Sequence, residues 1–324
     1  MQQKQAHLPM ESKSDGTIRQ VGFEIEFSGL TFDQCIEIVA DKLGDKVSRR
    51  SHIEAIITNN ALGDFTLELD WQFLKDQARE TGSDNEFIKV IAELAGTVVP
   101  LELVCPPIAV NEISALDDTI DALRSAGAKG TDDSFLYAFG VHINTDIPDL
   151  EAETITRYLK AYCVLQDYLV QAHSVNTMRR IFPYVDLYKE PYIRQVLTYE
   201  TPGIGELITD YLNHNPTRNR AFDMLPIFAC IDEKRIQKEL DDPRIKSRPA
   251  FHYRMPNCHI EQPSWSLQTD WKIWCQLEML ADDSTALNEV TNEYRQRLKA
   301  GQFITDSNWA QYIQNWMTSY IHGS

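Results

Sequence analysis

Two glutamates, Glu24 and Glu26, alternate with apolar residues in the segment 21–27, which reads VGFEIEF. A period of two is typical of a β-strand, so both carboxylates point to one face and the apolar side chains to the other. Next-but-one residues of a strand lie roughly 7 Å apart, and at that spacing two carboxylates can each bind a divalent cation or together flank a pair of them. Taken alone, the segment is better explained as an ordinary strand with one face in water. The metal hypothesis therefore depends on other strands bringing polar groups to the same face.

Other predicted strands repeat this arrangement of polar residues between apolar ones. Three pairs each share one face of a strand, namely Glu68 with Asp70, His142 with Asn144, and His252 with Arg254, and Glu102 lies between two leucines. None of these positions is a lysine. Clustered carboxylates repel one another unless a cation neutralises them, and oxygen ligands with one or two imidazoles suit Mg²⁺ or Mn²⁺ better than zinc. We therefore predict a metal site formed by Glu24, Glu26, Glu102, His142 and His252. For the pair Glu68 and Asp70, a solvated flank of a hairpin is the favoured interpretation.

The elements that would position these residues follow from periodicity and capping signals. Thr31-x-x-Gln34 predicts a helix that runs to Leu43, and Ser83-x-x-Glu86 predicts another that ends at Gly96. Besides the first strand, we predict strands at 52–58, 65–71, 97–104, 136–145 and 250–256 and helices near 111–126, 148–172, 269–282, 284–299 and 306–321. Short helices and functional loops are expected from 173 to 249. Hairpins mixed with helices predict an α+β fold in which helices cover one face of a sheet.

Composition narrows the classes of function. The formal net charge of −17 argues against nucleic acid or an anionic membrane as partner. No run of about 18 uncharged apolar residues occurs, so no membrane span is expected. Residues 1–17 are polar and are expected to be a disordered tail, leaving residues 18–324 as a single catalytic domain with C-terminal helices. The six cysteines form no Cys-x-x-Cys pair, which favours reduced thiols and a cytoplasmic protein.

Four segments in chain order carry a resemblance to a known family. They are GFEIEF at 22–27, LELVCPP at 101–107, GVHIN at 140–144 and YRMPN at 253–257. Together they resemble the putative amidoligase family of the glutamine synthetase and glutamate–cysteine ligase superfamily, over roughly residues 18–282. The resemblance implies a mostly antiparallel sheet of about six strands, similar to the glutamine synthetase catalytic domain. It also implies an open sheet face that binds ATP with two or three Mg²⁺ ions, and ATP-dependent joining of a carboxylate to an amine.

The resemblance also implies roles for single residues. Glu24 and Glu26 match the family's Glu-x-Glu metal motif, Glu102 matches the acid of its later strand, and His142 matches the strand histidine that meets metal or phosphate. Arg254 matches an arginine near the phosphates. The chain departs from the superfamily at His252-Tyr253-Arg254, where the last strand often reads Glu-x-Arg. An imidazole can still ligate Mg²⁺ or Mn²⁺, but this substitution changes the expected geometry at that metal.

The resulting hypothesis is a Mg-ATP-dependent ligase that forms an amide through an acyl phosphate. Its expected catalytic residues are Glu24, Glu26 and Arg254, and its expected nucleotide-binding residues are His142, Asn144, Arg179, Arg180, Arg220 and Arg254. A surface ion pair is the competing interpretation for each arginine of the 173–220 region. Neither a P-loop motif nor a Gly-x-Ser-x-Gly elbow is present.

Two alternatives stay open at this point. They are a metal-dependent hydrolase that uses the same acidic face, and a non-catalytic binding protein with a ligase fold. The expected partners are small-molecule or peptide acids and amines, and a glutamine amidotransferase that supplies ammonia is a further candidate.

Overall fold

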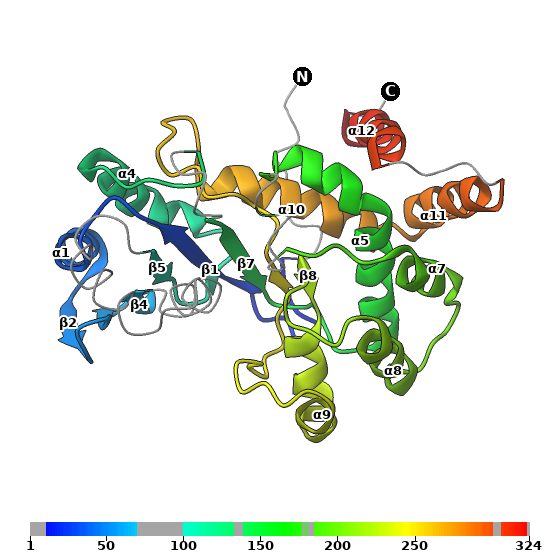
Figure 1. The fold of residues 1–324 in the computed structure, drawn as a ribbon, viewed down its shortest axis with the longest axis horizontal. Coiled ribbons are helices and arrows are strands. Elements are labelled where there is room, and N and C mark those ends of the chain that lie inside the picture. Colours follow the sequence, from blue (N-terminus) through cyan, green and yellow to red (C-terminus); the bar gives the residue numbers. More distant parts are fainter. Residues whose placement is uncertain are drawn as a thin grey trace, which may run out of the picture. The chain divides into compact units, whose positions relative to one another are not determined.

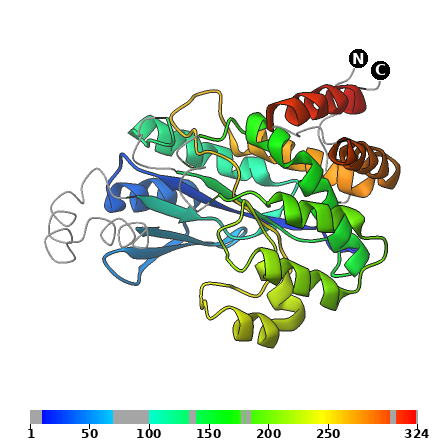
Figure 2. The same ribbon diagram turned by 45° about the vertical axis from the view of Figure 1, so that its right-hand side comes forward.

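The computed structural model describes residues 11–69, 100–132, 139–176, 179, 185–300 and 306–322. These residues contain nine α-helices and nine β-strands, which confirms the predicted α+β class (Figures 1 and 2). They divide into two compact units. The sheet unit comprises residues 20–144 and 256–268, and the helical unit comprises residues 1–19, 145–255 and 269–324. The expectation of one catalytic domain over residues 18–324 stays a prediction.

Antiparallel strands form the centre of the sheet unit. In spatial order they are β2 (Lys46–Arg49), β3 (Glu54–Asn59), β4 (Gly63–Leu69), β5 (Leu101–Val104), β1 (Gln20–Phe27) and β7 (Val141–Thr145), and β6 (Ile108–Ala109) pairs with β1. With the short strands β6, β8 (Phe222–Asp223) and β9 (His252–Tyr253) the described residues contain nine strands, more than the about six implied by the resemblance. Ile25 is opposite Leu103, which is opposite Leu67, and all three are buried. The apolar residues of β1, β5 and β4 therefore share the covered face.

Helix α1 (Phe32–Leu43) begins at the predicted capping box. The Thr31 hydroxyl accepts a hydrogen bond from the Gln34 amide, and the Gln34 side chain accepts one from the Thr31 amide. The helix ends at Gly44, where a Cβ atom would lie only 2.7 Å from the Ala40 Cα and 2.9 Å from the Ile57 Cγ2. Local signals thus define this helix at both ends.

Several predicted boundaries in the sheet unit differ from the structure. The helix expected from Asn111 is a 3-10 helix, η1 (Ile113–Leu116), followed by α4 (Asp117–Ala126), and no side-chain cap precedes either of them. The strand expected at 136–145 is described from Val141. The capping box at Ser83-x-x-Glu86 with its helix, and Asp70, lie outside the described residues.

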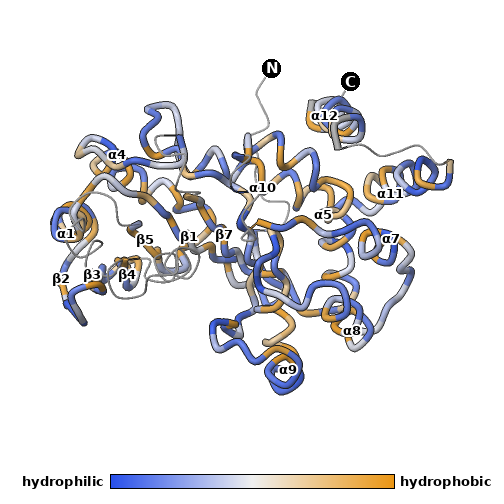
Figure 3. Tube along the Cα trace, in the orientation of Figure 1, coloured by the Kyte–Doolittle hydropathy of each residue, from blue (hydrophilic) through white to orange (hydrophobic). Residues whose placement is uncertain are grey.

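The helical unit contains most of the helices, and the apolar stripes of helices such as α8 are visible in Figure 3. The helices of this unit are α5 (Ala152–Ala172), α7 (Glu190–Thr198), α8 (Ile204–His214), α9 (Leu225–Glu239), α10 (Leu267–Asp282), α11 (Ser284–Lys299) and α12 (Asp306–His322). The last three agree with the predicted C-terminal helices within two residues. Residues 12–17, part of the expected tail, lie in a turn that is closed by a Ser12–Ile18 bridge. No helix among the described residues has both the length and the apolar character needed to span a bilayer.

The strand expected at 250–256 is much shorter in the structure. Only β9 (His252–Tyr253) is regular, and it pairs with β8 (Phe222–Asp223). The Arg179 guanidinium donates to the carbonyl oxygens of Arg254 and Met255, each at 2.9 Å, and Pro256 has no amide hydrogen to donate. The carbonyl oxygens of residues 254 and 255 are therefore bonded to a side chain, and residue 256 has no amide hydrogen for a strand ladder.

A buried ion pair lies in the core of the helical unit. The Arg19 guanidinium donates two hydrogen bonds to the Glu278 carboxylate, at 2.6 and 2.7 Å, and the Trp274 indole donates a third at 2.7 Å. Both charged side chains are at most 1% exposed. Each charge in this pair is thus matched by an opposite one.

Candidate metal centre

A row of glutamates crosses the polar face of the sheet unit. Glu26 on β1 is directly opposite Glu102 on β5, which is opposite Glu68 on β4, which is opposite Glu54 on β3. Directly opposite side chains on antiparallel strands have Cβ atoms about 5 Å apart, and like charges at such positions repel. The register thus brings Glu68 into line with two of the predicted ligands.

Glu54 is a member of this row that the sequence analysis did not single out. The sequence feature that indicates Glu54 is its position between apolar residues of the strand predicted at 52–58. Its carboxylate lies 3.3 Å from the Arg50 guanidinium. That arginine places a positive charge at the outer end of the row.

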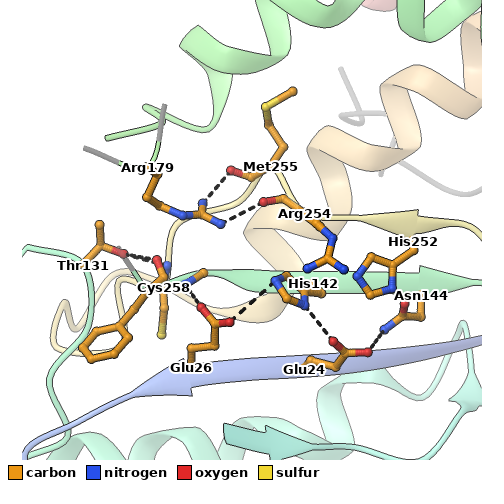
Figure 4. A network of polar contacts seen from close by, with 12 residues as sticks. Glu24, Glu26, Thr131, His142, Asn144, Arg179, His252, Arg254, Met255 and Cys258 are labelled. Carbon is orange, nitrogen blue, oxygen red and sulfur yellow. Dashed lines mark hydrogen bonds and ion pairs between the residues drawn. The ribbon is translucent and has the colours of Figure 1, made fainter. Parts of the chain in front are cut away.

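His142 on β7 lies between two of the carboxylates (Figure 4). Its Nδ1 is 2.7 Å from the Glu24 Oε2, and its Nε2 is 3.7 Å from the Glu26 Oε1. The Asn144 amide donates to the other Glu24 oxygen at 2.9 Å, and the Gly140 backbone amide donates to the Glu26 Oε2 at 2.7 Å. Both carboxylates are therefore held in fixed orientations.

The donor atoms fit a divalent cation. With Glu24 accepting from Nδ1–H, the lone pair of His142 is on Nε2 and faces Glu26. One ligand atom each from Glu26, Glu102 and His142 lie within 4.8 Å of one another. Two donors about 2.1 Å from one ion are separated by roughly 3 to 4.2 Å, so a small closure would complete the site. Two carboxylates with one imidazole suit Mg²⁺ or Mn²⁺.

A cysteine close to this face is not a candidate nucleophile. Burial, with a smaller effect of the Glu24 charge, raises the pKa of the Cys105 thiol to about 12. The thiolate is the nucleophilic form of cysteine, so Cys105 stays protonated and unreactive near neutral pH.

The remaining predicted site residues that the structure describes belong to the helical unit. The Arg179 guanidinium donates hydrogen bonds to the carbonyl oxygens of residues 254 and 255. The Arg220 guanidinium lies 3.1 Å from the Asp186 carboxylate, which fits the ion-pair interpretation. Arg180 lies outside the described residues.

His252 has a specific contact within the helical unit. The Arg248 guanidinium lies 2.6 Å from its Nδ1. An arginine can only donate, so Nδ1 accepts and the proton of the neutral imidazole is on Nε2. A metal-ligand role for His252 would require Arg248 to move or Nε2 to lose its proton, and this role stays a prediction.

Arg254 and Arg218 form a cationic group in the same unit. Arg254 is 7% exposed, and its buried Nε has no hydrogen-bond partner among the described residues. Burial, followed by the nearby charge of Arg254, lowers the pKa of the Arg218 guanidinium. Two guanidinium groups that disfavour each other's charge suit an oxyanion ligand. Arg218 is not among the site residues predicted from the sequence, although it lies in the run Arg218-Asn219-Arg220.

Fold and site together define a class of protein. An open antiparallel sheet presents carboxylates and an imidazole suited to a divalent cation, with helices packed against its other face. Residues 17–276 match the family model described as "Putative amidoligase enzyme". Since this match spans most of the chain, the protein belongs to the amidoligase family, as the resemblance implied. None of the curated proteins searched matches the chain.

Proposed function

We propose that the protein is an ATP- and Mg²⁺-dependent carboxylate–amine ligase that forms an amide through an acyl phosphate. The observation that carries the proposal is the Glu26–Glu102–His142 centre, found in a chain of the amidoligase family. When bound, Mg²⁺ would neutralise charge on the β- and γ-phosphates during transfer to a substrate carboxylate. An amine then displaces phosphate from the acyl phosphate.

The residues of the sheet unit have different roles in this reaction. Glu26, Glu102 and His142 hold the ion. Glu24 accepts the Nδ1 proton of His142 and so keeps the Nε2 lone pair directed at the ion. Asn144 fixes the second oxygen of Glu24. Glu24 thus acts on the metal through the imidazole, and a second ion would also have this carboxylate available.

In the helical unit, Arg254 and Arg218 hold an oxyanion, either a phosphate of the nucleotide or the carboxylate of the acid. Arg179 contributes by fixing the backbone that follows Arg254. The substrates are small-molecule or peptide acids and amines. A glutamine amidotransferase is one source of ammonia for this reaction.

The test is a turnover assay with the purified full-length protein, MgATP, a panel of carboxylic acids and either hydroxylamine or an amine. We expect ADP and phosphate to form only when an acid and a nucleophile are both present, and a hydroxamate or amide to appear in equal amount. The Glu26→Gln variant should lose this activity, whereas Glu37→Gln, on the exposed side of α1, should keep it.

Other outcomes would contradict the proposal in distinct ways. Metal-dependent release of phosphate from phosphoesters without any amine would indicate a hydrolase. Binding of MgATP without turnover of any acid and amine in the panel would indicate a binding protein that retains the ligase fold.

A further inference from the structure

A histidine–aspartate pair lies in the sheet unit, apart from the metal centre. The His259 Nδ1 is 2.9 Å from the Asp132 Oδ2, although the two residues are 127 positions apart in the chain. The Gln262 amide donates to the same Asp132 oxygen. The imidazole is 19% exposed and the carboxylate 43%, so the pair is accessible to a small molecule.

The hydrogen bonds define which nitrogen of His259 carries the proton. Asp132 accepts the Nδ1 proton, so the lone pair of the neutral imidazole is on Nε2. The Asn257 side-chain amide lies 3.3 Å from Nε2 and donates to it. The Nε2 lone pair of His259 therefore faces the Asn257 amide, which an ammonium group would have to replace as its donor.

Asn257 connects this imidazole to the metal centre. It forms a bridge with Gly140, whose amide donates to Glu26. Opposite residues share a face of a sheet, and residues 140 and 142 share one as well, so the Asn257 side chain lies on the face of His142. Two strand spacings put its backbone about 10 Å from that of Glu26, and Gly140 has no side chain to stand between them.

The loop that carries His259 is closely tied to the neighbouring chain. The Glu261 carboxylate accepts hydrogen bonds from the backbone amides of Gly130 and Asp132, both at 3.0 Å. The Thr131 amide donates to the Cys258 carbonyl at 2.7 Å. A Cβ atom at Gly130 would lie only 2.0 Å from that carbonyl oxygen. The imidazole is thus held in place before any substrate binds, as a catalytic group requires.

We propose that His259, oriented by Asp132, is the general base that deprotonates the amine substrate. This inference rests on the proposed ligase function and goes beyond it by naming the substrate class, an ammonium ion or alkylammonium group. One proton passes from the ammonium nitrogen to Nε2, and the Asp132 carboxylate stabilises the imidazolium. The nitrogen lone pair then forms the C–N bond as the bond between the acyl carbon and phosphate breaks. The second proton of the amine leaves with the phosphate.

The test compares two nucleophiles at neutral pH in the turnover assay. Amines are protonated at this pH, whereas hydroxylamine is largely neutral and needs no base before attack. His259→Gln should lower amide formation by about 10²- to 10⁴-fold and leave hydroxamate formation within about a factor of three. Asp132→Asn should show a smaller loss with the same preference for hydroxylamine. Glu261→Gln, which loosens the loop without touching the imidazole, should affect both nucleophiles alike.

Three results would overturn the proposal. Equal losses with both nucleophiles in His259→Gln, with unchanged Mn²⁺ binding, would show that His259 only positions the loop. Unchanged amide formation would remove His259 from the reaction. If the wild-type protein forms neither product with any acid of the panel, the ligase function itself fails, and this role of His259 with it.

Discussion

Carboxylates in the two units have opposite kinds of surroundings. In the helical unit, Glu278 is buried and receives two hydrogen bonds from Arg19 and one from Trp274. In the sheet unit, Glu26, Glu102 and Glu68 lie in register, and Glu26 is contacted by a neutral backbone amide and an imidazole. A carboxylate that stabilises the fold has a matched cation within the chain. Among the described residues, Glu26 has no guanidinium or ammonium partner, and a bound cation would supply that positive charge.

Breaking the balanced pair should have the largest effect on stability. Arg19→Ala leaves the Glu278 charge buried without its guanidinium, and we expect it to lower the free energy of unfolding by about 3 to 5 kcal/mol. Urea unfolding at neutral pH would measure this. The matched control is Lys13→Ala, which removes a partly exposed ion pair with Asp146 and should cost below about 1 kcal/mol. A loss below about 1 kcal/mol for Arg19→Ala would show that the pair does not stabilise the helical unit.

A second test concerns a buried carboxylate of the helical unit whose negative charge is not fully neutralised by the groups around it. Burial raises the pKa of Asp223 from 3.8 to about 6, although Arg254 acts in the opposite direction. The stability linked to protonated Asp223 is complete below pH 3.8 and is lost as pH rises through about 6.

Asp223→Asn should remove this pH dependence. The asparagine keeps an oxygen that can accept from the Leu225 amide and carries no charge. Relative to wild type, the variant should gain up to about 3 kcal/mol of unfolding free energy at pH 8 and gain little at pH 4. Unfolding curves at both pH values test this, and a gain that is the same at both would contradict the assignment.

A smaller effect on stability is expected for a glutamate on the polar face of the sheet unit. Glu68→Gln removes one charge opposite Glu102 and should raise the unfolding free energy of the metal-free protein by roughly 0.2 to 1 kcal/mol. Thermal unfolding with EDTA and with saturating Mg²⁺ measures it, and the gain should shrink when Mg²⁺ is present. Destabilisation in EDTA would mean that Glu68 is a structural carboxylate like Glu278.

The sequence predicts best the features that depend on neighbouring residues. The alternation in β1 defines both its faces, the Thr31 capping box starts α1, and the polar residues of β1, β5 and β7 do meet on one face. Each of these depends on a period or on a short-range hydrogen bond, which the sequence records directly.

The features missed depend on contacts between distant parts of the chain. Glu54 joins the carboxylate row through strand register, and Asp132 meets His259 across 127 positions. In the strand predicted at 250–256, Arg179, far away in sequence, donates to the carbonyl oxygens of Arg254 and Met255. No local pattern predicts such pairings.

The central claim is that the sheet face binds a divalent cation through Glu26, Glu102 and His142. Calorimetric titration of the full-length protein with Mn²⁺ tests it most directly, with Glu26→Gln and Glu102→Gln compared with the surface control Glu37→Gln. The claim predicts that each of the first two variants weakens Mn²⁺ binding by at least about tenfold while the control binds like wild type and all three stay folded. Wild-type Mn²⁺ affinity in both Glu26→Gln and Glu102→Gln would contradict it.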